Sequence, residues 1–184
     1  MTMLQEAARL AFEGYSIFPC RNKLPLTQHG FKDASNDAKV IADWWARWPE
    51  AQIAVATGKV SGLFVLDVDG PEGEALVLQL NLPETRTIET RPGRKQLWFQ
   101  QPEGVTTKSD AGVLAPQLDR RGDGGYVIAP PSIHHETGQP YRIARACSKC
   151  PRATATVQLV LTKSRRAGVT QQCFRSPGPC ARAV

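Results

Sequence analysis

Residues 61–70 read SGLFVLDVDG, and this stretch decides the fold because it predicts a central strand. The apolar run of residues 63–66 has glycine on either side, which is typical of a strand buried on both faces. Side chains alternate between the two faces of a strand, so we expect Asp67 and Asp69 to point one way and Val68 the other. Two neighbouring carboxylates repel each other. Such a pair needs a cation, a shared proton or basic partners.

Length and composition indicate one soluble domain of ordinary size. The chain has 184 residues, of which 41% are hydrophobic and 22% charged, values typical of globular proteins. No run approaches the roughly 18 apolar residues of a membrane span, and the N-terminus lacks a basic segment followed by an apolar one. We therefore expect a cytoplasmic protein with no membrane partner.

Positive charge is concentrated near the C-terminus. The net charge is +6, and eight of the 23 Lys and Arg residues lie in residues 145–184, which contain none of the 17 acids. Residues 1–144 therefore carry 15 basic residues against 17 acidic ones. A nucleic-acid-binding surface in this part of the chain must be a local patch, because there is no global positive field.

This split predicts two regions, a folded domain over residues 1–144 and a basic, cysteine-containing tail over residues 145–184. Four of the five cysteines lie in the tail, namely Cys147, Cys150, Cys173 and Cys180. Only the first two have the spacing of common zinc ligands. Three interpretations of the tail stay open: a zinc site, a poorly ordered segment with reduced thiols, or the truncated or frame-altered end of a longer chain.

Hydrophobic periodicity predicts helices over residues 2–13, 37–48 and 72–80. Ser35 or Asn36 is the expected N-cap of the second helix. One face of that helix carries Ile41, Trp44, Trp45 and Trp48, which we assign to the core. Strands are predicted at residues 15–20, 53–56, 63–66, 85–90, 96–100, 117–119 and 126–129. Helices flanking several strands indicate an α/β or α+β two-layer sandwich.

Five segments, taken together and in order, resemble one protein family. They read SIFPCRNKLPL (16–26), ADWWARWPEAQIAVATG (42–58), SGLFVLDVDG (61–70), GRKQLWF (93–99) and LDRRGDGGYVIAPPSIHHETGQPY (118–141). They are similar to the N-terminal domain of bifunctional DNA primase/polymerases (prim-pol), within the archaeo-eukaryotic primase superfamily, over about residues 8–142. The resemblance implies a primase-polymerase fold with a mixed, RRM-like central sheet flanked by helices. It also implies a role in phage, plasmid or mobile-element replication.

The resemblance further implies template-directed nucleotidyl transfer by a DNA primase/polymerase, with single-stranded DNA as template and nucleoside triphosphates as substrates. This reaction develops charge on the attacking 3′-oxygen and on the leaving pyrophosphate, and two divalent ions stabilise both. Asp67 and Asp69 match the family's paired acids and Asp119 its third acid. All three are predicted to be catalytic and to bind Mg²⁺ or Mn²⁺. The alternative is a strand end whose acids cap the following helix.

Three neighbouring residues are predicted to contact the triphosphate. Gln96 stands where the family has a histidine. Glutamine can donate a hydrogen bond to a phosphate oxygen, but it carries no charge and cannot titrate. Arg94 and Lys95 would restore positive charge beside it. The alternative for these two is a pair of solvated turn residues.

The segment after Asp119 supplies three more predicted nucleotide contacts. Strand alternation allows only one of Arg120 and Arg121 to share the face of Asp119, and we expect it to be Arg121. Ser132 and His134 match the family's PPSxH pattern and are expected to contact phosphate or sugar.

Two loop residues complete the predicted site and its surroundings. Lys23 follows the first strand and is predicted to contact template or primer phosphate, with a solvated loop lysine as the alternative. Asp123 lies between glycines, which favours a turn-forming role over a ligand role.

Two other functions stay open. The first is a prim-pol-like domain that binds nucleic acid or nucleotide with weakened catalysis, as Gln96 would favour. The second is a phosphohydrolase with Asp67 as nucleophile. The sequence contains no G-x-x-x-x-G-K-[ST] pattern, so a partner helicase would be a separate chain or a missing portion.

Overall fold

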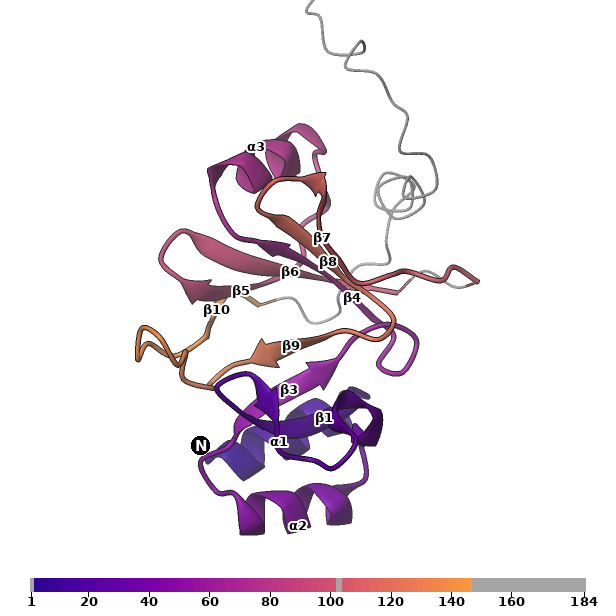
Figure 1. The fold of residues 1–184 in the computed structure, drawn as a ribbon, viewed down its shortest axis with the longest axis vertical. Coiled ribbons are helices and arrows are strands. Elements are labelled where there is room, and N and C mark those ends of the chain that lie inside the picture. Colours follow the sequence, from indigo (N-terminus) through magenta and orange to yellow (C-terminus); the bar gives the residue numbers. More distant parts are fainter. Residues whose placement is uncertain (1, 102–103, 147–184) are drawn as a thin grey trace, which may run out of the picture.

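The computed structural model describes residues 2–101 and 104–146, and the tail cysteines fall outside this part of the chain (Figure 1). The elements are α1 (Met3–Phe12), β1 (Ile17–Arg21), β2 (Leu24–Pro25), the 3-10 helix η1 (Gly30–Asp33), α2 (Ala38–Arg47), β3 (Gln52–Ala56), β4 (Leu63–Val68), α3 (Pro71–Gln79), β5 (Arg86–Arg91), β6 (Arg94–Gln100), β7 (Asp110–Ala115), β8 (Leu118–Arg121), β9 (Tyr126–Ala129) and β10 (Arg142–Arg145). The sequence-based prediction did not include β2, η1, β7 or β10.

The strands form two sheets. The four-stranded sheet has the order β2-β1-β3-β9, and the six-stranded sheet has the order β10-β5-β6-β4-β8-β7. Every pair of named strands within the described residues is antiparallel. The predicted α+β class is therefore confirmed, whereas the expected single mixed sheet is in fact two antiparallel sheets.

Helices cover the outer face of each sheet, which gives two α/β layers (Figure 1). The helices α1 and α2 pack on the four-stranded sheet, and α3 packs on the β7–β8 side of the six-stranded sheet. Asp37 caps α2, one residue later than expected, because its Oδ1 accepts hydrogen bonds from Lys39 N at 2.8 Å and Val40 N at 3.1 Å. None of the helices in the described ranges is long and apolar enough to span a membrane.

Only part of the expected tryptophan face of α2 belongs to the core. Ile41 and Trp45 are buried in the main hydrophobic cluster, and Trp44 packs against it while partly exposed. Trp48 lies half-buried at the end of the helix, with the guanidinium of Arg47 5.3 Å from the centre of its ring. The helix ends there, so its last turn extends past the edge of the core.

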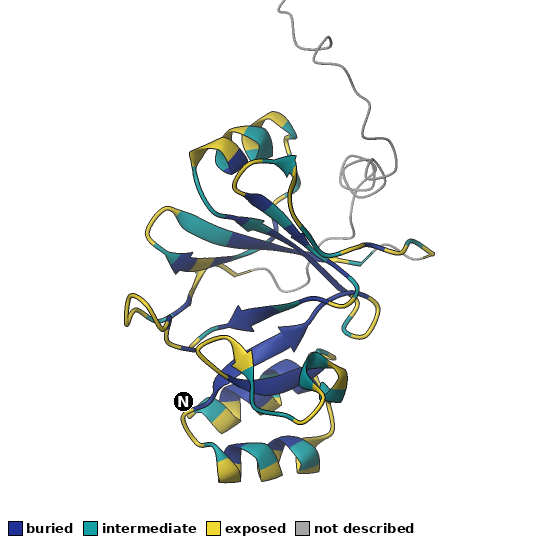
Figure 2. Cartoon of the chain, in the orientation of Figure 1, coloured by how far each residue is buried: buried dark blue, intermediate teal, exposed yellow. Residues whose placement is uncertain are grey.

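Strand β4 lies in the middle of the six-stranded sheet and is buried on both faces (Figure 2). Leu63 and Val65 belong to the cluster shared with the four-stranded sheet. Phe64, Leu66 and Val68 belong to a second cluster, which packs against side chains of α3. This alternation places position 67 on the face that looks toward the other sheet.

The turn from β8 to β9 carries the chain from one sheet to the other, and Asp123 holds it in place. Its Oδ1 accepts a hydrogen bond from Lys59 N at 2.8 Å and its Oδ2 one from Thr107 N at 3.2 Å. A side chain at Gly122 would collide with the backbone of Thr107. The expected turn-forming role of Asp123 agrees with these contacts.

The start of α3 packs tightly on the turn between β7 and β8. A Cβ at Gly73 would collide with the backbone carbonyl of Gln117. The same carbonyl accepts a hydrogen bond from Asp69 N at 2.8 Å. Gly73 therefore allows the close approach that keeps the end of β4 beside β8.

We predict that Gly73→Ala destabilises the protein. In an exposed helix this change would stabilise by up to about 1 kcal/mol, but here the added methyl group must push α3 away from Gln117. The free energy of unfolding, measured by urea denaturation, should fall by about 1–3 kcal/mol. The exposed neighbour Glu72→Ala serves as control. An increase in stability for Gly73→Ala would show that the contact is not tight.

Candidate active site

A polar cavity of about 430 Å³ lies between the two sheets. The six-stranded sheet contributes Asp67, Arg94, Gln96 and Arg121 to its wall, and Asp69 lies just beyond the end of β4. The other wall is formed by residues 124–128, which are the end of the glycine turn and the start of β9. The acids of the opening stretch therefore face a space large enough for a small ligand.

Strand register brings two of the predicted acids directly together. Asp67 on β4 is the cross-strand partner of Asp119 on β8, and on its other side it pairs with Gln96 on β6. Directly opposite residues point to the same face of a sheet, with Cβ atoms about 4.5–5.5 Å apart. Asp67, Asp119 and Gln96, which are far apart in sequence, thus form one row across the sheet.

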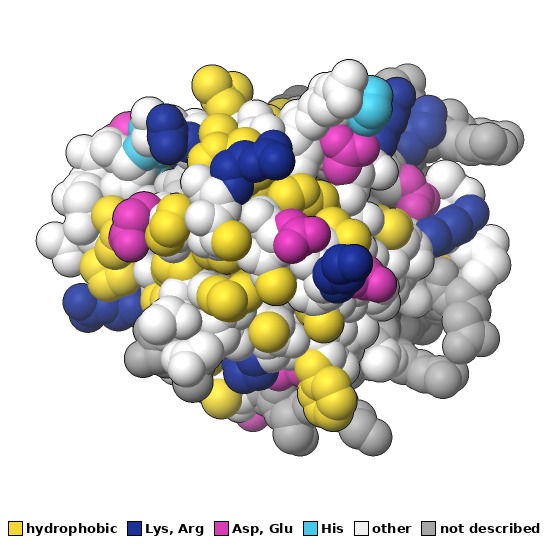
Figure 3. Space-filling view, turned by 90° about the horizontal axis from the view of Figure 1, so that it is seen from below, with side chains coloured by type: hydrophobic (Ala, Val, Ile, Leu, Met, Phe, Trp, Pro, Cys, Tyr) yellow, Lys and Arg dark blue, Asp and Glu magenta, His cyan; other side chains and the backbone are white. Residues whose placement is uncertain are grey.

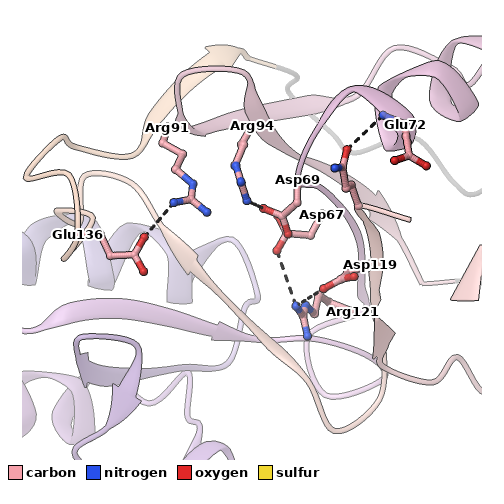
Figure 4. A network of polar contacts seen from close by, with 9 residues as sticks. Asp67, Asp69, Glu72, Arg91, Arg94, Asp119, Arg121 and Glu136 are labelled. Atoms are coloured by element: carbon pink, nitrogen blue, oxygen red, sulfur yellow. Dashed lines mark hydrogen bonds and ion pairs between the residues drawn. The ribbon is translucent and has the colours of Figure 1, made fainter. Parts of the chain in front are cut away.

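Arg121 lines the cavity, whereas Asp119, with which it pairs, is not one of the lining residues (Figure 4). Its Nη2 donates to Asp119 Oδ2 at 2.8 Å and lies 3.9 Å from Asp67 Oδ2. Asp119 Oδ1 also accepts a hydrogen bond from Gly112 N at 3.0 Å. As alternation predicts, Arg121 shares the face of Asp119, while Arg120 is buried on the other face and pairs with Asp110.

A second arginine holds the third acid. Arg94 Nη1 donates to Asp69 Oδ1 at 2.9 Å, and both side chains are about one-third exposed, at 36% and 35%. Arg91 is the cross-strand partner of Arg94 at the end of the β5–β6 hairpin. Arg91 also lines the cavity but pairs with Glu136 at 2.9 Å rather than with one of the three acids.

Burial raises the pKa of Asp67 to about 6, and the carboxylates of Asp69 and Asp119 add to this effect. The positive charges of Arg121 and Lys23 partly offset it. A carboxylate with like-charged neighbours and little solvent binds a proton more tightly than usual. It is also a group for which a bound cation would be strongly favourable.

The three acids have the chemistry of a Mg²⁺ or Mn²⁺ site, because these ions prefer carboxylate oxygen. However, no group of three or more His, Cys, Asp or Glu side chains is arranged to hold a metal ion within residues 2–101 and 104–146. Figure 4 shows that arginines pair with Asp69 and Asp119. The donor set fits such an ion, but its geometry is that of an arginine-paired state.

The structure separates the two predicted triphosphate contacts that flank Gln96. Arg94 and Gln96 both line the cavity, whereas Lys95 points to the opposite face of β6 and binds Glu74 of α3 at 2.8 Å. Lys95 is therefore not placed to contact a ligand in the cavity. Gln96 is 4% exposed, and its Oε1 accepts a hydrogen bond from Trp98 Nε1 at 3.1 Å.

Ser132 and His134 also differ in position. Ser132 is fully buried, and its hydroxyl accepts a hydrogen bond from Ile53 N at 2.9 Å, so it holds β3 rather than lining the cavity. His134 lines the cavity, and its Nδ1 accepts a hydrogen bond from Glu136 N at 3.3 Å. Burial, together with the charges of Lys23 and Arg91, lowers the pKa of His134. A neutral ring with this contact carries its proton on Nε2.

Lys23 lies at the cavity, at the tip of the β1–β2 hairpin. Its amide donates to Gln52 Oε1 at 2.8 Å, and its carbonyl accepts from the hydroxyl of Tyr126 at 2.9 Å. The hairpin tip is thereby anchored to the four-stranded sheet. The side chain of Lys23 joins Arg91, Arg94 and Arg121 in giving the cavity positive groups.

Sequence reasoning missed three cavity residues, Arg91, Tyr126 and Tyr141. Arg91 was detectable, because a two-residue turn over residues 92–93 makes positions 91 and 94 cross-strand partners. Tyr126 begins β9 after the glycine turn. For Tyr141, which precedes β10 and is 3% exposed, no local signal predicted its approach to the cavity.

Comparison with known proteins identifies the family. Residues 7–155 match the model of the N-terminal domain of bifunctional DNA primase/polymerases. The match covers most of the chain, so the protein belongs to this family. The family implies nucleotidyl transfer of the DNA primase/polymerase type. The matched region extends past residue 144, the predicted domain end. A search of curated proteins found no match.

We predict that Asp67→Asn stabilises the metal-free protein at neutral pH. A raised carboxyl pKa means that the folded state binds the proton more tightly than the unfolded state. The contribution of Asp67 to stability is therefore greatest at low pH and falls as pH rises from about 4, the ordinary pKa, to the folded pKa of about 6. The variant should lose this fall and gain about 1–3 kcal/mol in unfolding free energy at pH 7.5 in EDTA.

The measurement is chemical denaturation between pH 4 and pH 8. Asp43→Asn, which removes a charge from an exposed position on α2, controls for net charge. If Asp67→Asn is less stable than the wild type at pH 7.5, burial and the neighbouring carboxylates do not disfavour the ionised form of Asp67 as described.

Proposed function

We propose that this protein catalyses template-directed nucleotidyl transfer, with Asp67, Asp69 and Asp119 as catalytic acids. The observation that carries the proposal is the register of β4 with β8, which pairs Asp67 with Asp119 on the same face of the six-stranded sheet. Asp69, two residues after Asp67, reaches the same cavity. Family membership supports the type of reaction, and the position of the acids supports this site for it.

The three carboxylates would hold Mg²⁺ or Mn²⁺, since all their donors are oxygen atoms. Bound divalent ions neutralise the developing charge on the attacking 3′-oxygen and on the leaving pyrophosphate. In this reaction the primer 3′-oxygen would form a bond to the α-phosphorus and release its proton to water, while the bond from the α-phosphorus to the bridging oxygen would break and release pyrophosphate. Asp67, with a pKa of about 6, is ionised at neutral pH and available as a ligand.

The nucleoside triphosphate would lie against the arginines of the cavity. Arg94 and Arg121 offer guanidinium groups, which bind phosphate oxygens with two parallel hydrogen bonds. Gln96 offers amide N–H groups, because its carbonyl oxygen is engaged with Trp98. His134, neutral and at the cavity wall, is suited to a hydroxyl or phosphate oxygen. Lys95 and Ser132 are left out of this set because of their positions.

A single-stranded DNA template is the proposed nucleic-acid partner, and it would enter beside Lys23. The outer face of α1 and α2 is a poor alternative surface, because its Lys and Arg side chains are scattered among apolar ones (Figure 3). In the cavity, by contrast, four positive side chains line one space, namely Lys23, Arg91, Arg94 and Arg121. A phosphate backbone is attracted to such a local patch.

We further propose that the protein acts in the cytoplasm, in replication of a phage, plasmid or mobile element. A helicase would then act with it, as a separate chain or in a missing portion. The residues that support the proposal are those of the family pattern quoted above, including the RGDGG turn, which links the two walls of the cavity.

Extension of a labelled primer on a single-stranded template, with Mn²⁺ and deoxynucleoside triphosphates, tests the catalytic assignment. Asp67→Ala and Asp119→Ala should each reduce the extension rate by at least about 100-fold, because each removes a metal ligand worth several kcal/mol in the transition state. Lys95→Ala is the matched control, since that side chain faces α3, and it should keep near wild-type activity.

Two results would contradict the proposal. Retained extension in Asp67→Ala or Asp119→Ala would reject the assignment of the acids. Absence of extension in the wild type, together with Mn²⁺-dependent nucleotide binding, would favour a binding domain with weakened catalysis, for which the uncharged Gln96 gives the physical reason.

A further inference from the structure

Two arginines of the cavity wall form ion pairs with the acids that are the proposed cation ligands. Arg94 holds Asp69 at 2.9 Å, and Arg121 holds Asp119 at 2.8 Å and lies 3.9 Å from Asp67 (Figure 4). Within the described chain these acids form no metal-ready cluster. Each arginine therefore competes with a cation for the carboxylate with which it is paired.

We propose that Arg94 and Arg121 exchange partners: they pair with Asp69 and Asp119, as in the structure, until cation and nucleotide bind, and then pair with triphosphate oxygens. This inference rests on the proposed function and adds to it a coupling between the two ligands. It assigns the arginines a role in excluding a cation or a nucleotide that arrives alone.

Charge balance gives the physical reason for the exchange. Three carboxylates at one spot repel each other, and two guanidinium groups offset most of that charge. A divalent ion on the carboxylates would repel the same arginines, while a triphosphate would attract them. Conversely, a triphosphate without a cation would face three carboxylates. Each ligand thus removes the obstacle to the other, which is positive and reciprocal coupling.

The side chains are free enough to make this exchange. Arg94 and Arg121 are 36% and 32% exposed, and each is held by partly exposed ion pairs, which individually contribute little stability. Arg120 provides the contrast, because it is 2% exposed and its pairing with Asp110 is part of the fold. The arginines that face the cavity can move without unfolding the sheet.

Arg91 makes a control for the test. It lines the same cavity and is the cross-strand partner of Arg94, but its ion-pair partner is Glu136. Arg91→Gln removes one positive charge from the cavity wall without releasing Asp67, Asp69 or Asp119. If a substitution of Arg94 or Arg121 changes the Mn²⁺ affinity more than Arg91→Gln does, the excess comes from the carboxylate that it releases.

The experiment measures Mn²⁺ binding to the full chain without nucleotide, from the electron paramagnetic resonance signal of the free ion. Relative to wild type, the double variant Arg94→Gln with Arg121→Gln should bind Mn²⁺ about 5- to 10-fold more tightly. Arg94→Gln alone, at an exposed position that folding tolerates, should give about 2- to 5-fold. Arg91→Gln should change the affinity by less than about twofold.

A second measurement uses a fluorescent nucleoside triphosphate in saturating Mn²⁺, the condition in which the proposal places the arginines on the phosphates. Here the double variant should bind at least about 5-fold more weakly than wild type, because the arginines are the groups that receive the phosphates. Tighter Mn²⁺ binding with unchanged nucleotide binding would overturn the exchange, since the arginines would then only neutralise the acids. Equal Mn²⁺ effects of Arg94→Gln and Arg91→Gln would overturn it as well.

Asp67→Ala separates failure of this inference from failure of the proposed function. If Asp67→Ala abolishes Mn²⁺ binding but the arginine variants leave it unchanged, the exchange is wrong and the metal site stands. If Asp67→Ala leaves Mn²⁺ binding intact, the metal site itself is wrong, and the exchange falls with it.

Discussion

The antiparallel pairing of β4 with β8 is the constraint on which the site depends. It places Asp67 opposite Asp119, although the two residues are far apart in the sequence. The alternation of β4 then decides what each face does: Phe64, Leu66 and Val68 pack under α3, while position 67 faces the other sheet. A register slip of one residue would bury the carboxylate against α3 and place Val68 on the cavity wall. Buried packing of β4 therefore enforces the geometry of the proposed catalytic site as well as the fold.

Electrostatic repulsion among the three carboxylates explains why positively charged side chains lie beside them. Asp67 has a raised pKa because solvent is scarce and like charges are near. Arg94 and Arg121 offset that repulsion by pairing with Asp69 and Asp119. Guanidinium groups also bind phosphate oxygens well, so under the proposed function the same two side chains would neutralise the acids and receive the triphosphate. Gln96 can contribute hydrogen bonding but no charge, so in the proposed site the positive charge comes from the arginines and Lys23.

The sequence predicted those features that follow from local periodicity. The buried strand over residues 63–66, the shared direction of Asp67 and Asp69, and the choice of Arg121 over Arg120 all follow from period-two alternation. The same rule, applied to β6, would have chosen Arg94 and excluded Lys95. The burial of Ser132 depends on its contact with Ile53, and the position of Tyr141 depends on how β10 joins the sheet. Such contacts between distant segments leave no local pattern in the sequence. The division into two sheets, where one was expected, leaves no local pattern either.

The central claim is that Asp67, Asp69 and Asp119 jointly hold divalent cations beneath the phosphates of a nucleotide. A crystal structure of the protein with Mn²⁺ and a non-hydrolysable nucleoside triphosphate tests it most directly, because manganese is located by its anomalous scattering. We predict manganese within about 2.0–2.3 Å of oxygen atoms from all three carboxylates, with Arg94 and Arg121 turned to the triphosphate. Manganese and nucleotide bound elsewhere, with both arginines still paired to Asp69 and Asp119, would contradict the account.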